Sequence, residues 1–74
     1  MRTAPVTADR SVLVDDLEGL PGSAAGCVLA LTLASAVWIR AGDVWWVEDD
    51  VLHVRRGQRP PVAHAGCLEW RRKW

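Results

Sequence analysis

Residues 28–40 read VLALTLASAVWIR, and their pattern predicts β structure. Large apolar side chains alternate there with small or polar ones, which is the period of a β-strand with one buried face. We expect a turn at residues 34–36, because one strand of this length is improbable in a domain of 74 residues. The face predicted to be buried carries Leu29, Leu31, Leu33, Val37 and Ile39.

Turns and short apolar runs continue beyond this stretch. Residues 41–43 (AGD) and 48–50 (EDD) are typical turn sequences. Residues 57–61 contain two prolines, which cannot donate to a strand ladder, so this segment is predicted to be an irregular loop. Further strands are expected over residues 44–47, 51–56 and 67–71.

The fold predicted from these elements is mainly β. Successive hairpins at 34–36, 41–43 and 48–50 would make a small antiparallel β-meander of four or five strands, curled into a compact sheet or partial barrel. Residues 1–10 show no pattern and contain Pro5, so a flexible N-terminal tail is expected. Residues 11–74 then form a single small β domain.

Charge is distributed unevenly along the chain. Residues 1–50 hold three basic and eight acidic side chains, a net charge of −5, whereas residues 51–74 hold six basic and one acidic, a net charge of +5. Antiparallel pairing of the two parts would cancel this dipole in space, so its effect depends on the fold.

Residues 19–39 carry no charge and are formally long enough to cross a bilayer. A small membrane protein with residues 20–39 in the bilayer is therefore an alternative, although Gly, Pro, Ser and Thr make the stretch a poor span. No signal peptide is indicated, because Arg2 is not followed by an apolar segment and acidic residues precede the first long one. A cytoplasmic protein with reduced Cys27 and Cys67 is expected.

Glycine, valine and tryptophan recur in three short runs over residues 20–47. The elements are Gly26-x-Val28-Leu29, then Ala36-Val37-Trp38-Ile39-Arg40, then Gly42-Asp43-x-Trp45-Trp46. This arrangement resembles short uncharacterised Trp-containing β-rich proteins of actinobacteria and their phages. The resemblance implies a bacterial or phage β-meander, and it brings no known activity.

No catalytic or metal site is predicted. His64-x-x-Cys67 has a plausible ligand spacing for zinc, but Cys27 and His53 are isolated from that pair in the sequence. The paired carboxylates occur in turn-like runs, and no glycine-rich phosphate loop is present. We therefore expect a protein that is not an enzyme and needs no cofactor.

Protein binding is the leading functional hypothesis, and it depends on three tryptophans. Trp45 and Trp46 are adjacent on one predicted strand, so one faces the core and the other faces the opposite surface. If Trp38 shares that surface, the outward pair would form an aromatic patch of the kind enriched at protein interfaces. Another protein, or a second copy of this chain, would be the partner.

Nucleic-acid binding is the alternative. The C-terminal part mixes phosphate-neutralising arginines with tryptophans that could stack on bases. A sequence pI of about 6.7 is low for a dedicated nucleic-acid binder, and the arginines could instead pair with the acidic turn at 48–50. The candidate residues are Arg55, Arg56, Arg59, Trp70, Arg71, Arg72 and Lys73.

Overall fold

The computed structural model describes the backbone of residues 2–15 and 27–72, and the side chains of residues 2–15 and 33–66. Seven antiparallel strands and no helix occupy the described residues, so the prediction of a mainly β fold is confirmed. The strands are β1 (Val6–Thr7), β2 (Val12–Val14), β3 (Cys27–Leu33), β4 (Val37–Ile39), β5 (Val44–Glu48), β6 (Val51–Arg55) and β7 (Val62–Arg72).

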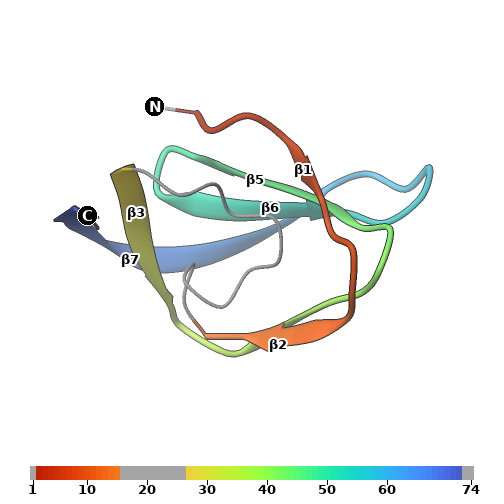
Figure 1. The fold of residues 1–74 in the computed structure, drawn as a ribbon, viewed down its shortest axis with the longest axis horizontal. Coiled ribbons are helices and arrows are strands. Elements are labelled where there is room, and N and C mark those ends of the chain that lie inside the picture. Colours follow the sequence, from red (N-terminus) through yellow and green to blue (C-terminus); the bar gives the residue numbers. More distant parts are fainter. Residues whose placement is uncertain (1, 16–26, 73–74) are drawn as a thin grey trace.

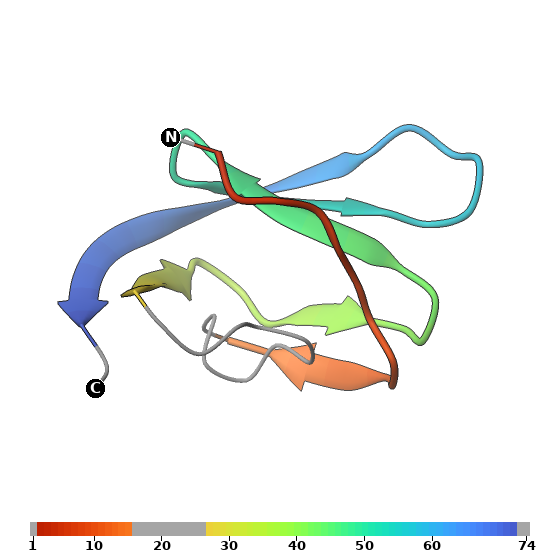
Figure 2. The same ribbon diagram turned by 45° about the horizontal axis from the view of Figure 1, so that its top comes forward.

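The strands form two sheets that lie against each other (Figures 1 and 2). Five strands pair in the order β1-β5-β6-β7-β3, and β2 pairs with β4 alone. β7 belongs to both halves of the larger sheet, because residues 62–65 pair with β6 and residues 66–72 pair with β3. Figure 2 shows this long strand curving from one layer toward the other.

The core lies between the two sheets and follows the alternation seen in the sequence. Leu33, Val37 and Ile39 are buried. Trp38, between the last two, and Arg40, directly after Ile39, are exposed. Leu29 and Leu31 lie in β3, where the side chains are outside the described part. The most completely buried side chains are Ile39, Leu52, Val14 and Val47.

Only part of the predicted meander is present. β5, β6 and β7 are joined by successive hairpins, and the two-residue turn at Asp49 and Asp50 has positive φ at both positions, as a type I′ hairpin turn requires. The predicted hairpins at 34–36 and 41–43 are wrong: both are turns, but β3 pairs with β7 and β4 pairs with β2. Alternation specifies which face of a strand is buried but does not specify its partner, so the sequence pattern could not distinguish a hairpin from a corner between sheets.

The N-terminal segment differs from the expected flexible tail. β1 pairs with β5, and Thr3 exchanges two hydrogen bonds with the backbone of Val47, at 2.8 Å each. Ala8 is 3% exposed and belongs to the core cluster. The physical reason is that β5 has a free edge on the side away from β6, and the N-terminal residues supply its missing hydrogen-bond partners.

The ladder between β3 and β7 also places the two cysteines. Cys27 lies opposite Arg72 and Cys67 lies opposite Thr32. These rungs are five residues apart, or about 17 Å along the strands, whereas a disulfide needs Cα atoms about 4.4–6.8 Å apart. The register therefore excludes a disulfide between Cys27 and Cys67 within one chain.

No described residue belongs to a helix with the length and apolar character of a membrane span. Within the stretch considered as a span, residues 27–33 and 37–39 are β-strands, and residues 20–26 lie outside the described part.

Candidate functional site

Trp45 and Trp46 lie on opposite faces of β5, but both are buried. Trp45 is 5% exposed and packs in the core between the sheets. Trp46 is 8% exposed on the other face, where strand alternation directs it away from that core cluster. The predicted pairing of an outward tryptophan with Trp38 on one exposed surface is therefore not what the structure contains.

Two side chains from distant parts of the sequence contact Trp46. His53, its direct partner across the β5–β6 ladder, stacks on the indole with ring centroids 5.5 Å apart and an angle of 7° between the rings. The Arg2 guanidinium carbon lies 5.8 Å from the centre of the Trp46 ring, within cation–π range. The N-terminal segment thus covers a tryptophan that the sequence alone left as a surface candidate.

Substitution Arg2→Ala tests this covering contact. We expect the indole of Trp46 to become more accessible, with a stability loss of about 0.5–1 kcal/mol, which is typical of a cation–π contact at an exposed site. The measurement is acrylamide quenching of fluorescence in a Trp38→Phe, Trp70→Phe, Trp74→Phe background, in which only Trp45 and Trp46 contribute indole signal. Arg10→Ala is the control, because Arg10 pairs only loosely, at 4.0 Å, with Asp9. Equal quenching in both variants would contradict the assignment.

Trp38 is the exposed tryptophan of the described side chains. It is 61% exposed on β4 and lies directly opposite Leu13 of β2, which is 50% exposed. The neighbouring side chains Val37 and Ile39 point into the core, so the outer face of β2–β4 presents Trp38 and Leu13 together. We call this pair the Trp38–Leu13 patch. Leu13 was not among the residues predicted from the sequence. Its place between Val12 and Val14 indicates that its side chain points to the opposite face of the strand from theirs.

The basic candidates for nucleic-acid binding are divided between two ends of the molecule. Arg55 and Arg59 are exposed at or near the β6–β7 loop, whereas Arg71 and Arg72 lie at the other end of β7. Val62 and Arg72 are ten positions apart, which corresponds to roughly 33 Å along the strand. Figure 1 shows the loop and the C-terminal end of β7 on opposite sides. The side chains of Trp70, Arg71 and Arg72 are outside the described part, and so is all of Lys73.

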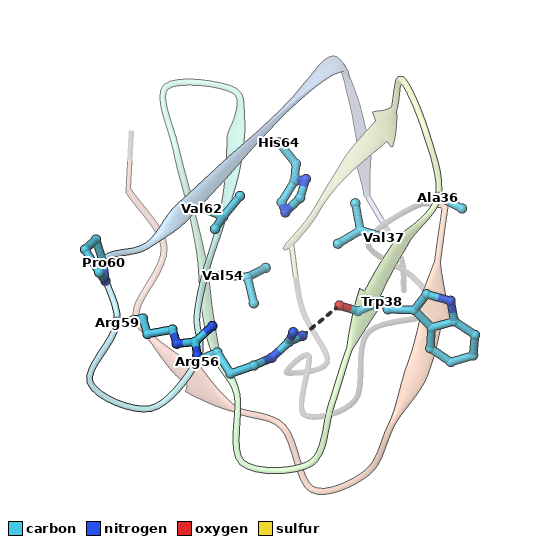
Figure 3. Close-up of a pocket in the computed structure, with 9 residues that line it drawn as sticks. All are labelled: Ala36, Val37, Trp38, Val54, Arg56, Arg59, Pro60, Val62 and His64. Carbon is cyan, nitrogen blue, oxygen red and sulfur yellow. Dashed lines mark hydrogen bonds between the residues drawn. The ribbon is translucent and has the colours of Figure 1, made fainter.

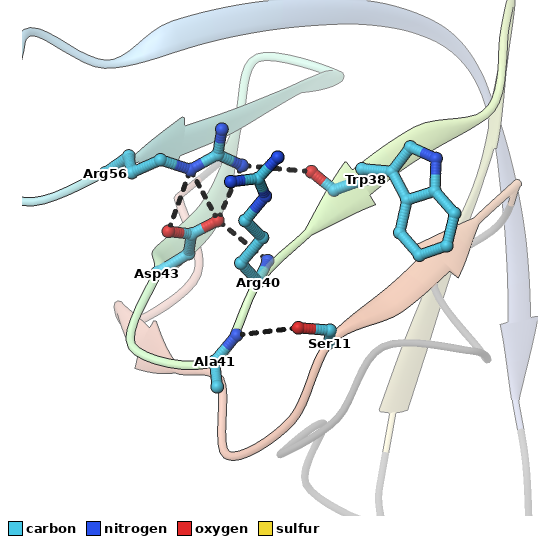
Figure 4. Close-up of polar contacts among 6 residues, drawn as sticks. All are labelled: Ser11, Trp38, Arg40, Ala41, Asp43 and Arg56. Carbon is cyan, nitrogen blue, oxygen red and sulfur yellow. Dashed lines mark hydrogen bonds and ion pairs between the residues drawn. The ribbon is translucent and has the colours of Figure 1, made fainter.

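Arg56 is engaged in an ion pair with a buried carboxylate. Its Nη2 donates to Asp43 Oδ2 at 3.0 Å, and its Nε lies 3.2 Å and 3.3 Å from the two carboxylate oxygens (Figure 4). Asp43 Oδ2 also accepts from the backbone N–H of Arg40 at 2.8 Å. The side chain of Asp43 is 3% exposed and that of Arg56 is 48% exposed. The sequence placed Asp43 in a turn and gave no sign of this pairing.

These contacts favour the charged form of Asp43. The hydrogen bond from Arg56 lowers the pKa of the Asp43 carboxyl below its usual value, and the Arg40 N–H lowers it further, against the opposing effect of burial. The same pairing raises the pKa of Arg56. Arg56 is therefore held as part of the structure and is less available for a phosphate than the sequence suggested.

A cavity of about 500 Å³ lies between β4 and the β6–β7 hairpin (Figure 3). Its apolar lining includes Val37, Val54 and Val62, and Arg56, Arg59 and His64 contribute polar groups. In Figure 3 the Trp38 ring points away from this space, and the Trp38 carbonyl faces Arg56, whose Nη2 lies 3.4 Å from it. We call this cavity the β4–β7 groove, and it is separate from the Trp38–Leu13 patch.

Within the described residues, no three His, Cys, Asp or Glu side chains lie close enough together to hold a metal ion. The two histidines take different places, His53 against Trp46 and His64 in the β4–β7 groove.

No protein-family model matches the chain, and neither the curated proteins nor the solved structures include a significant match.

Proposed function

We propose that this chain is a small non-enzymatic module that binds another protein through the Trp38–Leu13 patch. The observation that carries the proposal is the 61% exposure of Trp38 beside a half-exposed Leu13 in a domain whose other described tryptophans are buried. A tryptophan side chain can bury roughly 150–250 Å² on contact with a partner. Tryptophan is enriched among the few residues that contribute most of the binding energy at protein interfaces.

The surrounding structure supports the patch as a preorganised surface. Both residues lie on strands whose alternate side chains are held in the core, Val14 at 1% and Ile39 at 0% exposure. A partner would therefore meet side chains on a fixed backbone, which reduces the conformational entropy lost on binding.

Nucleic-acid binding has weaker support. Arg59 precedes β7 and Arg71 lies near the far end of that strand, and Arg56 is paired with Asp43. Binding of a single strand through stacking would need exposed aromatic rings beside the arginines, and the Trp38 ring points away from Arg56 and Arg59 in Figure 3.

The first test replaces Leu13 with a photo-crosslinking amino acid in cells of the native host. We expect a crosslinked adduct with a discrete protein, and none when the crosslinker replaces Thr7, which is exposed on β1. With that partner purified, Trp38→Ala should weaken binding by at least about 30-fold, the equivalent of about 2 kcal/mol. An adduct between two copies of this chain would identify a homo-oligomer through the same patch.

Two results would contradict the proposal. One is the same adduct from the Thr7 position, and the other is an affinity that Trp38→Ala leaves unchanged while circular dichroism shows that the variant is folded.

The alternative function has its own test. If the protein does not bind nucleic acid, a fluorescent 20-nucleotide single strand should show no salt-dependent binding at micromolar protein. A binder using five phosphate contacts would instead lose about 100-fold in affinity between 50 mM and 200 mM salt, because fewer counterions are released at higher salt. Such a dependence, abolished by charge reversal at Arg55 and Arg59, would favour the nucleic-acid hypothesis.

A further inference from the structure

The β4–β7 groove lies between two strand edges that are not paired with each other. β4 pairs with β2 on one side, and residues 62–65 of β7 pair with β6 on one side. In the part of the chain that the structure describes, no strand pairs with the facing edges of these two segments. The gap is where the two sheets would otherwise join.

The backbone of β4 directs hydrogen-bonding groups into this gap. The carbonyl of Trp38 faces Arg56, and the N–H and C=O of one strand residue point to the same side, so the Trp38 N–H also faces the groove. Further along this edge, Asp43 makes two hydrogen bonds to the backbone of Arg40. The Asp43 carboxylate accepts from the Arg40 N–H at 2.8 Å, and the Asp43 backbone N–H donates to the Arg40 C=O at 3.0 Å. Asp43 and Arg56 thus occupy one end of the edge, and residues 36–38 form the part beyond them.

The facing edge of β7 is directed in the same way. The carbonyl of Ala65 accepts from the N–H of Ala34 at 3.4 Å, on the side of β7 away from β6. Backbone groups two residues apart in a strand point to the same side, so the N–H and C=O of Ala63 face the groove as well. The groove is therefore bordered on two sides by backbone donors and acceptors.

Charge and shape indicate what could occupy this gap. Arg59 is exposed on the rim, and among the described side chains that line the groove there is no carboxylate. Asp43 nearby is already paired with Arg56. The apolar lining of Val37, Val54 and Val62 suits aliphatic side chains, and a volume of about 500 Å³ is in the usual range of ligand sites, about 300–1,000 Å³.

We propose that the β4–β7 groove binds an extended acidic segment of a partner protein, which adds as a strand between β4 and the first half of β7. The proposal rests on the proposed function as a protein-binding module and names a second contact surface for it. The Trp38 carbonyl already accepts from Arg56, so main-chain hydrogen bonds to the Trp38 N–H and to the N–H and C=O of Ala63 supply affinity, as in other strand additions. Alternate side chains of the segment contact the three valines, and an acidic side chain pairs with Arg59.

The probe is an acetylated and amidated peptide of sequence TVEVEVT, titrated into the ¹⁵N-labelled protein. We expect amide shifts concentrated at residues 36–38 and 62–64, slowed hydrogen exchange of the Trp38 and Ala63 amides, and saturation below about 1 mM. The peptide TVKVKVT should bind at least about tenfold more weakly. The Arg59→Glu variant should lose affinity for TVEVEVT by a similar factor and recover part of it for TVKVKVT.

The backbone contribution has a separate control. N-methylation of alternate residues of TVEVEVT removes the donors of one edge and should abolish binding, since strand addition depends on them. Main-chain pairing tolerates varied side chains, so an absence of shifts at residues 36–38 and 63 with millimolar TVEVEVT would overturn the proposal. Binding that survives N-methylation would also overturn it.

The variant Leu13→Ser keeps this test independent of the Trp38–Leu13 patch. Leu13 lies on the β2 side of the small sheet, so the variant should bind TVEVEVT within about twofold of the unsubstituted protein. Shifts that occur only around Leu13 would overturn the groove proposal and leave the patch as the binding surface. Groove binding together with a patch that fails the crosslinking test would support the groove proposal and contradict the Trp38–Leu13 patch as a binding surface.

Discussion

Trp45→Ala should destabilise the protein more than any other tryptophan substitution among the described positions. Trp45 packs in the core at 5% exposure, and loss of a buried Trp costs about 3–5 kcal/mol through lost burial and the cavity left behind. Small domains have total stabilities of about 5–15 kcal/mol, so this loss would remove much of what is available. Urea denaturation followed by far-ultraviolet circular dichroism measures it.

Trp38→Ala is the matched comparison, because the same chemical change is made at 61% exposure. We expect a change in unfolding free energy within about 0.5 kcal/mol, as for most surface substitutions. If both variants unfolded, Trp38 would be a core residue and the Trp38–Leu13 patch would not be a free surface.

Asp43→Asn is expected to have the second largest effect. The substitution weakens the hydrogen bonds from Arg56 and Arg40 to a nearly buried carboxylate, and bonds to a charged group contribute about 1.5–3 kcal/mol each. Because Arg56 is half-exposed, solvent screens its ion pair with Asp43 and reduces what that pair contributes to stability. We therefore expect the free energy of unfolding to fall by about 1.5–3 kcal/mol in total at pH 7. Asp9→Asn is the control, because Asp9 is exposed and makes only a 4.0 Å pair with Arg10.

The same carboxylate predicts a pH dependence with a definite sign. The pKa of Asp43 is lower in the folded protein than the value of about 3.9 expected in the unfolded chain. Its stabilisation is therefore fully present above that unfolded value and is lost as the pH falls through the folded value. The difference in stability between the unsubstituted protein and Asp43→Asn should be constant from pH 5 to 7 and should shrink toward pH 3. A difference that stays constant down to pH 3 would contradict the assignment.

Strand positions and the buried face could be predicted from residues 28–56 because these features are local. The alternation through Leu33, Val37 and Ile39 identified the core side, and the acidic residues at 49–50 identified a true hairpin. The N-terminal strand escaped prediction because two residues, Val6 and Thr7, are too few to show a period. Of the candidate site, Trp38 could be selected from the sequence, whereas Leu13 gains its meaning only from the register that places it opposite Trp38.

The strand character of the chain, the phase of its apolar side chains and the position of its turns could be deduced from the sequence, because these features follow from neighbouring residues. Strand pairing could not, since every strand edge offers the same N–H and C=O groups. The structure was also needed to show that Arg2 covers Trp46, that Asp43 pairs with Arg56, and that a groove separates β4 from β7. Each of these depends on residues 13 or more positions apart in the sequence, and local patterns carry no information about such contacts.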